Sequence, residues 1–252
     1  MVKRSFLSLA AIEQNDWPFS SQTKTRTLTE RTYTTLRIDI IEGRLQPGSK
    51  LRIEYLREIY QVGAGTIREA LTRLVSDALV VVEGQRGFRV APIALEDLED
   101  MTRLRVQIEI EALRLSMRHG DGRWRARLQQ AFEVLTALES TISMENRRQW
   151  ENANSHFHEA LLAGHQSNWT MRVLHLLSQH SERYRCYSIG LKDLNRDVHA
   201  EHNEIYRYVI EGQEARAALA LEAHIWATPL LLIKAMREGR LVLPNASAIA
   251  SS

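Results

Sequence analysis

Four side chains with metal-ligating groups lie at spacings that would bring them together in a helical domain. Asn154 and His158 are four residues apart, so both project from one face of the same helix. His202 lies in a later helical stretch, and His224 follows 22 residues after it. Imidazole nitrogens and an amide oxygen from neighbouring helices can close on one divalent ion. Asn154, His158, His202 and His224 are therefore candidate ligands for zinc or a similar ion, although their spacing alone does not establish a metal site.

The same imidazoles have a second interpretation, a metal-free polar pocket in which they hydrogen-bond a ligand directly. The chain has nine histidines, so accidental pairs are expected, and most of the others are interpreted as surface or hydrogen-bonded core residues. A helical metal-dependent hydrolase is the third possibility. No HExxH string and no nucleophile–base pair accompanies the histidines, so an enzyme is not predicted.

Arginines in the same region are candidates for binding an anion. Arg183 and Arg185 stand two residues apart in the string Glu182-Arg183-Tyr184-Arg185. A guanidinium offers a planar, permanently charged fork that matches a carboxylate. Both arginines are therefore effector-binding candidates, and salt bridges to nearby glutamates are the alternative interpretation.

Upstream, residues 51–74 predict two short amphipathic helices joined by a turn. Apolar residues recur at helical spacing in both, at Leu51, Leu56 and Ile59 and then at Ile67, Ala70, Leu71 and Leu74. Val62 fits the buried position of the turn, and Gly63 fits the backbone geometry between two crossing helices. Hydrogen-bond donors occupy the outer face of the second helix, at Thr66, Arg68, Thr72 and Arg73. This pattern predicts a helix-turn-helix whose second helix contacts the major groove of DNA.

The residues on either side complete a winged domain. A helical pattern covers residues 28–42 and ends at a turn that contains Gly and Pro. Residues 79–90 predict a two-stranded hairpin, with Gln85, Arg86 and Gly87 at its tip. We expect Arg86 to contact a phosphate or the minor groove of the DNA. Gly87 permits close approach of the hairpin backbone to the DNA.

Beyond Pro92 the chain is almost entirely helical. Six amphipathic runs are separated by short breaks, at residues 95–119, 122–142, 147–163, 168–189, 196–211 and 214–237. Pro229 predicts a kink or break near residues 227–228, because proline removes a helical hydrogen bond. The sequence thus predicts a mainly α protein with a flexible arm (1–27), a winged helix-turn-helix of three helices and a two-stranded wing (28–92), a helical bundle (93–240) and a tail (241–252).

Composition is typical of a globular protein of a reducing compartment. The chain has 44% hydrophobic and 25% charged residues, and its single cysteine, Cys186, excludes an intrachain disulfide. Residues 1–93 hold 14 of the 33 Lys/Arg and 10 of the 31 Asp/Glu, so the excess of positive charge lies at the DNA-binding end. The apolar run 6–12 lacks a cleavage site, and no run approaches the roughly 18 apolar residues of a membrane span. We therefore expect a cytoplasmic protein with no membrane partner.

Three strings in order, EGRLQPGSKL, VGAGTIREALTRL and LVVVEGQRGFRVAP, resemble the DNA-binding domain of the GntR family of bacterial regulators over residues 30–92. Residues 68–74 match the family's helix signature, and residues 86–87 match its wing. Where the family usually has Ser-Arg-Thr-Pro, this chain has Gly-Ala-Gly-Thr at residues 63–66. The arginine that leads the family's recognition helix is absent at Ala64, so its base contact is not carried over.

The bundle resembles the FadR C-terminal (FCD) class of GntR regulators, through RVQIE at residues 105–109, FHEAL at residues 157–161, Glu201-His202 and His224. That class is a helical effector-binding domain that frequently holds a divalent metal through one Asp and three His. The resemblance places Asn154 at the Asp and the three predicted histidines at the His. The amide removes a negative charge, which implies a lower metal affinity. The resemblance also places Arg105 toward the cavity, where a carboxylate ligand would be its partner.

Within this class, the strings VGAGTIREAL, VEGQRGFRVA, FHEALLAG and SERYR are most similar to the carbon-starvation regulator branch, which represses catabolic genes and responds to glutarate. The resemblance implies a homodimeric transcription repressor that binds palindromic operator DNA. A small carboxylate effector, such as the dicarboxylate glutarate, would bind the bundle and release the operator. A nucleoid protein that binds DNA without sequence preference fits the wing, but it leaves the bundle without a role.

Overall fold

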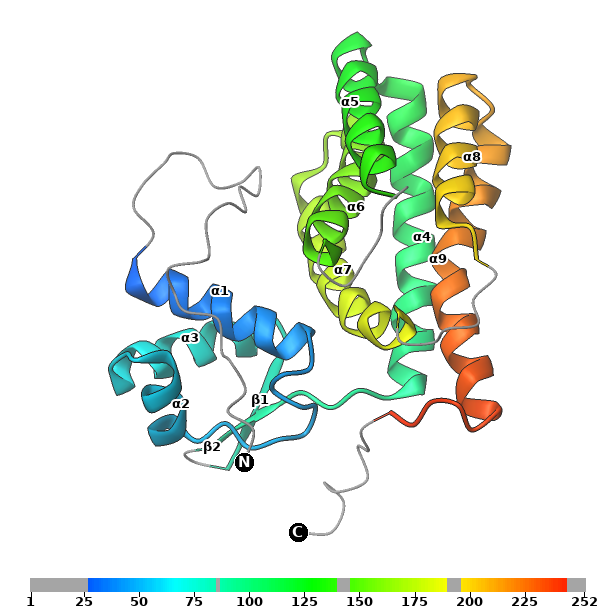
Figure 1. The fold of residues 1–252 in the computed structure, drawn as a ribbon. Coiled ribbons are helices and arrows are strands. Elements are labelled where there is room, and N and C mark those ends of the chain that lie inside the picture. The colour runs from blue at the N-terminus through cyan, green and yellow to red at the C-terminus, as the bar shows by residue number, and fades with distance from the viewer. Residues whose placement is uncertain (1–26, 85–86, 140–145, 190–195, 244–252) are drawn as a thin grey trace. The chain divides into compact units, whose positions relative to one another are not determined.

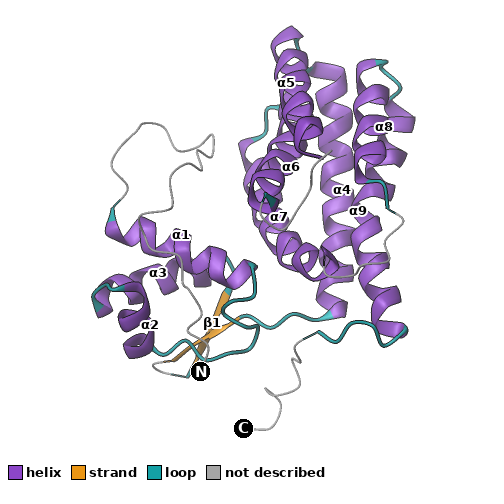
Figure 2. Ribbon diagram, in the orientation of Figure 1, coloured by secondary structure: helices purple, strands orange, loops and turns teal. Residues whose placement is uncertain are grey.

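Helices form most of the architecture, and a two-stranded sheet follows the third helix (Figures 1 and 2). In this computed structural model the described residues are 27–84, 87–139, 146–189 and 196–243. The predicted arm therefore lies outside the described residues except for Thr27. The chain divides into two compact units, unit 1 of residues 1–94 with 242–252 and unit 2 of residues 95–241. The predicted mainly α fold, with a winged domain followed by a helical domain, is confirmed.

Unit 1 contains three helices and the two strands, namely α1 (Leu28–Ile41), α2 (Ile53–Tyr60), α3 (Ala64–Ser76), β1 (Val80–Glu83) and β2 (Gly87–Val90). The residues that were predicted to face inward on α3 are all fully buried, at Ile67, Ala70, Leu71 and Leu74. They pack with Leu36 and Ile40 of α1 and Leu56 of α2 in one hydrophobic cluster. Burial of these apolar side chains is what fixes the angle between the helices.

The turn between α2 and α3 differs from the prediction. The left-handed residue is Gln61, with φ of 53°, at the C-terminal end of α2. Gly63 has φ of −68° and extended backbone at the N-cap of α3, a conformation open to any residue. Val62, between them, is buried as expected. The turn is therefore made by a left-handed cap on α2, and Gly63 is not needed for its backbone geometry.

The wing is an antiparallel hairpin in which Val80 pairs with Val90 and Glu83 with Gly87. A Cβ atom at Gly87 would lie 2.8 Å from the carbonyl oxygen of Glu83, so the hairpin itself requires glycine there. Arg89 is fixed on β2, because its guanidinium donates to Glu83 Oε1 at 2.6 Å and to the carbonyl of Gly48. The predicted tip residues Gln85 and Arg86 lie outside the described residues.

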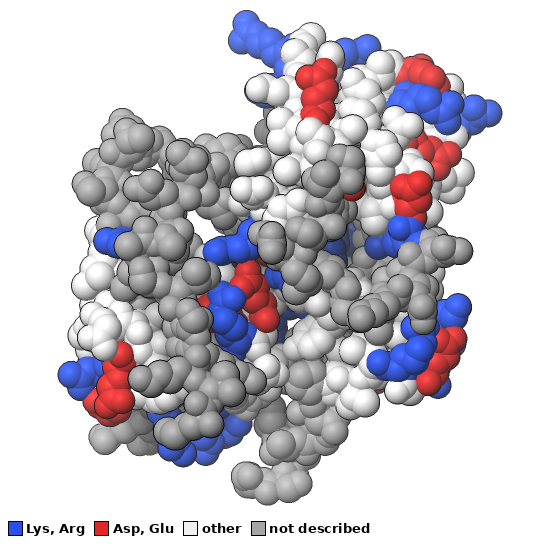
Figure 3. Space-filling view, in the orientation of Figure 1, with Lys and Arg blue, Asp and Glu red and all other residues white. Residues whose placement is uncertain are grey.

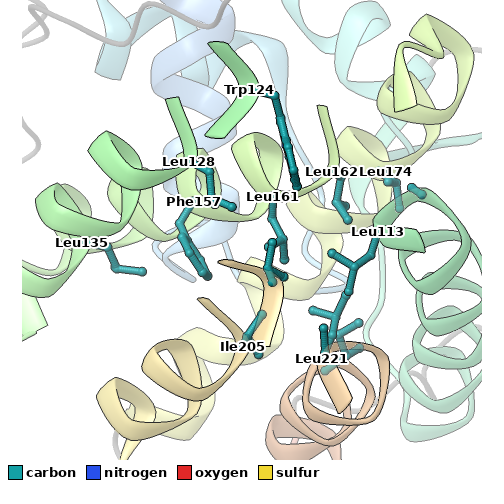
Figure 4. Packing of buried hydrophobic residues seen from close by; sticks show 14 of the residues in the cluster. Leu113, Trp124, Leu128, Leu135, Phe157, Leu161, Leu162, Leu174, Ile205 and Leu221 are labelled. Atoms are coloured by element: carbon teal, nitrogen blue, oxygen red, sulfur yellow. The ribbon is translucent and has the colours of Figure 1, made fainter. Parts of the chain in front are cut away.

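Unit 2 is a bundle of long helices, α4 (Leu95–His119), α5 (Gly122–Glu139), α6 (Arg147–Leu162), α7 (Asn168–Ile189), α8 (Val198–Ile210) and α9 (Glu214–Arg237), with a 3-10 turn η2 (Ala163–His165) after α6. Figure 4 shows the core, in which Trp124 and Leu128 of α5 lie near Phe157 and Leu161 of α6. The Trp124 indole also donates to the carbonyl of Ala160 at 2.9 Å. This packing holds α6, and with it the predicted metal ligands Asn154 and His158, in a fixed position.

The start of α8 and the course of α9 differ from the predictions. Helix α8 begins at Val198 and not at Arg196, because the Asp197 side chain accepts from the Ala200 N–H at 2.9 Å and caps the helix. Helix α9 continues through the buried Pro229, so the predicted break near residues 227–228 is absent. The predicted end of α5, at residue 142, falls outside the described residues.

The apolar character of α9 also departs from expectation. Among the described residues, α9 has the length and the hydropathy of a membrane-crossing helix, with a mean hydropathy of 1.3 over its best window. Its Leu221, Ile225 and Leu232 are nevertheless buried inside unit 2, where α9 packs on α4 and α8. Burial in the core accounts for this part of the helix, whereas Leu219 and Leu230 of α9 are exposed.

Candidate metal centre, effector cavity and DNA-binding helix

Three of the predicted ligands converge from three helices. One ring nitrogen from each of His158 (α6), His202 (α8) and His224 (α9) lies within 4.8 Å of the others. The Nε2 atoms of His158 and His224 are 3.2 Å apart, and the rings of His202 and His224 have centroids 4.5 Å apart. The side chains that were singled out from sequence are therefore neighbours in the structure.

Each imidazole has a carboxylate on its Nδ1 side. His202 Nδ1 lies 2.6 Å from Glu139 Oε1, and His224 Nδ1 lies 2.8 Å from Glu201 Oε2. The third pair is longer, with His158 Nδ1 3.7 Å from Glu109 Oε2. An ionised carboxylate only accepts hydrogen bonds, so Nδ1 of His202 and of His224 carries the proton. The lone pairs on Nε2 are then free for a ligand, as in carboxylate–histidine–metal sites.

The donor set fits a divalent ion. His202 Nε2 is buried without a hydrogen-bond partner in the described part of the chain, and Nε2 of His224 lies opposite Nε2 of His158. In a tetrahedral site with Zn–N of about 2.0–2.1 Å, the ligand nitrogens stand about 3.3 Å apart. Burial lowers the pKa of both His158 and His224, which favours the neutral imidazoles that metals bind.

Asn154 is placed beside this cluster. It is buried on α6, one helical turn before His158, and both residues line the same cavity. Its amide oxygen is the neutral donor that the sequence predicted for a fourth position. The structure therefore brings the four predicted ligands into one region of unit 2.

The cavity next to the imidazoles has a volume of about 180 Å³ and lies within unit 2. Its wall combines apolar side chains, such as Leu98 and Ile225, with many hydrogen-bonding groups. The polar side chains of the wall include Arg105, Asn154, Ser181, Arg185, Arg196 and Thr228. A small molecule with anionic or hydrogen-bonding groups is the type of ligand that such a wall accommodates.

Arg105 lines the cavity as the resemblance implied, and it is also paired. Its Nε donates to Glu109 Oε1 at 2.8 Å, and one terminal nitrogen donates to Ser181 Oγ at 2.8 Å. Although burial opposes ionisation, Arg105 and His158 hold the pKa of the Glu109 carboxyl at about 2. Arg105 thus neutralises a buried carboxylate and still has N–H groups left for a ligand.

The two candidates on α7 have different positions. Arg185 lines the cavity, and its guanidinium makes a two-pronged pair with Glu151, with contacts between 2.8 and 3.2 Å. Arg183 is buried on α7 and is not among the cavity-lining residues. The structure therefore brings Arg185, and not Arg183, to the cavity.

Arg196 was missed from the sequence. It stands two residues before α8, where no helical period marks a buried face, and it nevertheless lines the cavity. Two of its nitrogens donate to the two oxygens of Glu201 at 2.8 and 2.7 Å, and a third contact reaches Thr228 Oγ1 at 2.8 Å. Glu201 was considered from the sequence only as a salt-bridge partner of an arginine, and Glu139 was not considered, because both are distant in the chain from the histidines that they contact, His224 and His202.

In unit 1, the outer face of α3 carries the predicted DNA-contacting side chains. Arg68, Thr72 and Arg73 are exposed, and Thr66 is half-buried. The Arg73 guanidinium lies 4.4 Å from the centre of the Tyr33 ring, while the Arg68 side chain has no hydrogen bond or ion pair within the described residues and only its backbone carbonyl accepts, from Thr72. Arg68 is thus the arginine on this face that is free to donate to a base or phosphate.

Charged side chains of both signs are mixed on the face of unit 2 that Figure 3 shows. On the visible face of unit 2, basic and acidic groups lie next to one another (Figure 3). Arg118, for example, pairs with Glu214 through contacts of 2.6 and 2.8 Å. Such mixed surfaces do not favour a polyanion, so the helix-turn-helix of unit 1 is the better candidate for DNA contact.

Comparisons with known proteins agree with this division. Residues 28–90 match the family described as bacterial regulatory proteins, gntR family, and residues 100–227 match the FCD domain. The uncharacterized HTH-type transcriptional regulator BphR of Paraburkholderia xenovorans is 40% identical over 79% of this chain and 83% of the relative. The HTH-type transcriptional repressor GlaR of Escherichia coli is 30% identical over 82% of this chain and 96% of the relative.

Solved structures share the fold. Escherichia coli McbR/YncC superimposes with a TM-score of 0.67 over 84% of this chain and all of the other, at 20% sequence identity. The winged helix-turn-helix indicates DNA binding, the FCD domain indicates binding of a small-molecule effector, and the relatives are regulators and not enzymes. The chain therefore belongs to the GntR family of bacterial transcription regulators, within the group whose helix-turn-helix is followed by an FCD domain.

Proposed function

We propose that this regulator is a cytoplasmic repressor that binds a palindromic operator as a homodimer and releases it when a small carboxylate enters the FCD cavity. The observation that carries the proposal is the cavity of unit 2, whose wall includes Arg105, Arg185 and Arg196. Guanidinium groups match a carboxylate in charge and in planar geometry. The effector class follows from that match.

The repressor and dimer parts of the proposal rest on the DNA-binding unit and on the relatives. Each chain offers one α3, which contacts one half-site, and two-fold protein symmetry would match a palindromic operator. The E. coli relative GlaR carries the name transcriptional repressor, which supports the same sign of regulation here. Glutarate is the first effector to test, because the sequence resembles the glutarate-responsive branch.

A divalent ion such as zinc belongs to the same proposal. His158, His202 and His224 would hold it through Nε2, with the amide oxygen of Asn154 as a neutral fourth donor. When bound, the ion would add positive charge beside the cavity and favour an anionic effector. The carboxylates on the Nδ1 sides keep the rings oriented toward this position.

Replacement of Arg68 by alanine tests the DNA-contacting helix. We expect Arg68→Ala to weaken operator binding about 5- to 160-fold, because a good base contact contributes about 1–3 kcal/mol. Glutarate affinity should not change, since the cavity lies in the other unit. Fluorescence anisotropy measures operator affinity, on an operator selected from a random library. Calorimetry measures glutarate affinity. Arg216→Ala, on the exposed surface of α9, is the matched control. Unchanged operator affinity in Arg68→Ala would show that α3 does not contact the operator.

Release of the operator tests the effector. We expect glutarate to weaken operator binding of the wild-type protein about 5- to 150-fold, the usual range for coupling between two sites. The titration is repeated with succinate and adipate, and with zinc-free protein. If none of these acids releases the DNA, the proposed effector class is wrong. Equal release by zinc-loaded and zinc-free protein would contradict the role of the ion.

A further inference from the structure

We propose that Arg196 is the arginine of this cavity that exchanges its protein carboxylate for a carboxylate of the effector, which makes the effector a dicarboxylate. This inference rests on the proposed function and names a residue and a ligand class within it. The three cavity arginines are all paired in the structure, so a ligand carboxylate must share or replace an existing partner. The question is which pair can open.

Exposure of the three partner carboxylates decides this point. The side chains of Glu109 and Glu151 are each only 4% exposed, whereas that of Glu201 is 27% exposed. Removing the cation from a buried carboxylate leaves an uncompensated charge, which is strongly unfavourable. Glu201 can be hydrated when its guanidinium turns away, so its pair with Arg196 is the one that an incoming anion can open at low cost.

Arg196 is also held in position for exchange. Its contact with Thr228 Oγ1 of α9, at 2.8 Å, does not involve Glu201 and would persist when the carboxylate is replaced. A second contact, to the backbone carbonyl of His224 at 3.4 Å, keeps the guanidinium beside the imidazole cluster. The arginine therefore needs no large movement to bind a ligand carboxylate in place of Glu201.

Glu201 keeps a second partner after the exchange. Its Oε2 atom accepts from His224 Nδ1 at 2.8 Å, in addition to its contact with Arg196. Once Arg196 binds the effector, Glu201 retains this bond and is no longer neutralised by the arginine. Its negative charge then acts more strongly on His224, which would make that ring a better ligand for a cation.

The cavity offers a separate cationic group for a second carboxylate. Arg105 comes from α4, whereas Arg196 comes from the segment before α8, and both line the same cavity. A ligand that binds Arg196 with one group and Arg105 with another needs two carboxylates, and a short apolar chain would join them.

The experiment compares glutarate with pentanoate, a monocarboxylate of the same chain length, by isothermal titration calorimetry on the full-length zinc-loaded protein. We expect the wild type to prefer glutarate. In Arg196→Gln, glutarate affinity should fall about 10- to 100-fold, the range expected for a lost charge-assisted contact, and pentanoate affinity should stay the same. Arg207→Gln, an exposed arginine on α8, removes the same charge outside the cavity and should behave as wild type.

Arg196→Lys keeps the experiment decisive if the glutamine variant is unstable. Lysine retains the charge and loses the two-pronged geometry, so we expect an intermediate loss of glutarate affinity. Glutarate affinity equal to wild type in Arg196→Gln overturns the assignment of Arg196, and an equal loss for both acids overturns the dicarboxylate class, while the proposed function stands in both cases. A wild-type protein that binds neither acid overturns the proposed effector class and this inference together.

Discussion

Arg73 shows how one residue on a DNA-contacting face can also have a structural role. Its guanidinium lies over the ring of Tyr33, whose hydroxyl donates to Asp77 at 2.5 Å. The arginine therefore links α3 to α1 within unit 1. Arg68, on the same face, has no such partner among the described residues. The two arginines should respond differently to truncation.

We expect Arg73→Ala to lower the free energy of unfolding of unit 1 by about 0.5–1 kcal/mol, the usual contribution of an exposed cation–π contact. Arg68→Ala should leave the stability unchanged and lower only DNA affinity. Thermal unfolding followed by circular dichroism, with anisotropy on the same samples, separates the two effects. Equal stability of the two variants would show that the contact with Tyr33 contributes nothing in solution.

Cys186 gives a second prediction for a single residue. Burial raises the pKa of its thiol to about 12, so the thiol stays protonated at pH 8. Alkylation by iodoacetamide at pH 8 should be at least about 100-fold slower in the folded protein than in urea. Because the folded-state pKa lies above the unfolded value of 9.0, the contribution to stability is present below pH 9 and is lost as the pH rises toward 12. Rapid labelling of the native protein would contradict this environment.

The histidine ligands were predictable from sequence, and their supporting residues were not. His158, His202 and His224 stand in strings that resemble a known class, whereas Glu139 is 63 residues from the ring that it contacts. A hydrogen bond over such a separation follows from the packing of α5 against α8, which no local pattern encodes. For the same reason Arg183 was predicted to line the cavity and Arg196 was not. Only the packing of the bundle determines which side chains reach the cavity.

At the level of elements, two glycines in unit 1 have opposite roles. Gly65 lies in α3 with ordinary backbone angles, and a Cβ atom added there meets nothing within 4 Å. Gly87 begins β2, and a Cβ atom added there would come within 2.8 Å of the Glu83 carbonyl oxygen. One glycine is therefore dispensable for folding, and the other is required by the hairpin.

Gly65→Ala should stabilise unit 1 by about 0.5–1 kcal/mol, because alanine loses less conformational entropy in a helix than glycine does. Gly87→Ala should destabilise it by about 1–3 kcal/mol, because the hairpin must shift to make room. Chemical denaturation measures both. A stabilised or neutral Gly87→Ala variant would show that the wing relaxes around the methyl group.

Element limits show where sequence patterns stop being informative. The long runs of unit 2 were predicted within a few residues because apolar residues recur along them at helical spacing. The start of α8 was misplaced because the cap at Asp197 depends on one side-chain hydrogen bond. Pro229 did not end α9, because burial of that part of the helix in unit 2 outweighs the loss of one hydrogen bond.

The whole molecule has two separate hydrophobic cores, one in each unit. The predicted ligands His158, His202 and His224 all belong to unit 2. Zinc at a concentration 100 times its dissociation constant should stabilise unit 2 by about 2.7 kcal/mol and leave unit 1 unaffected. Differential scanning calorimetry with and without chelator measures this shift, and His202→Asn should abolish it. A shift that persists in His202→Asn would place zinc elsewhere.

The overall fold was predictable because both units follow strong local rules. Alternating helical periodicity, a two-stranded hairpin and short glycine-containing breaks predicted a winged domain and a bundle, and the structure contains both. The cavity was predictable only through the resemblance, since its wall is assembled from five helices and the segment before α8. Cavity chemistry depends on long-range packing, which a single sequence does not display.

The first residues of α3 have small side chains or none, and this has a practical consequence for regulator engineering. The helix starts with Ala64 and Gly65, and Cβ atoms added at Gly63 or Gly65 meet nothing within 4 Å. New side chains can therefore be installed at these positions without repacking the core. A library randomised at residues 63–65 should yield folded variants with altered operator choice, and such variants could control separate promoters in one cell without interfering with each other.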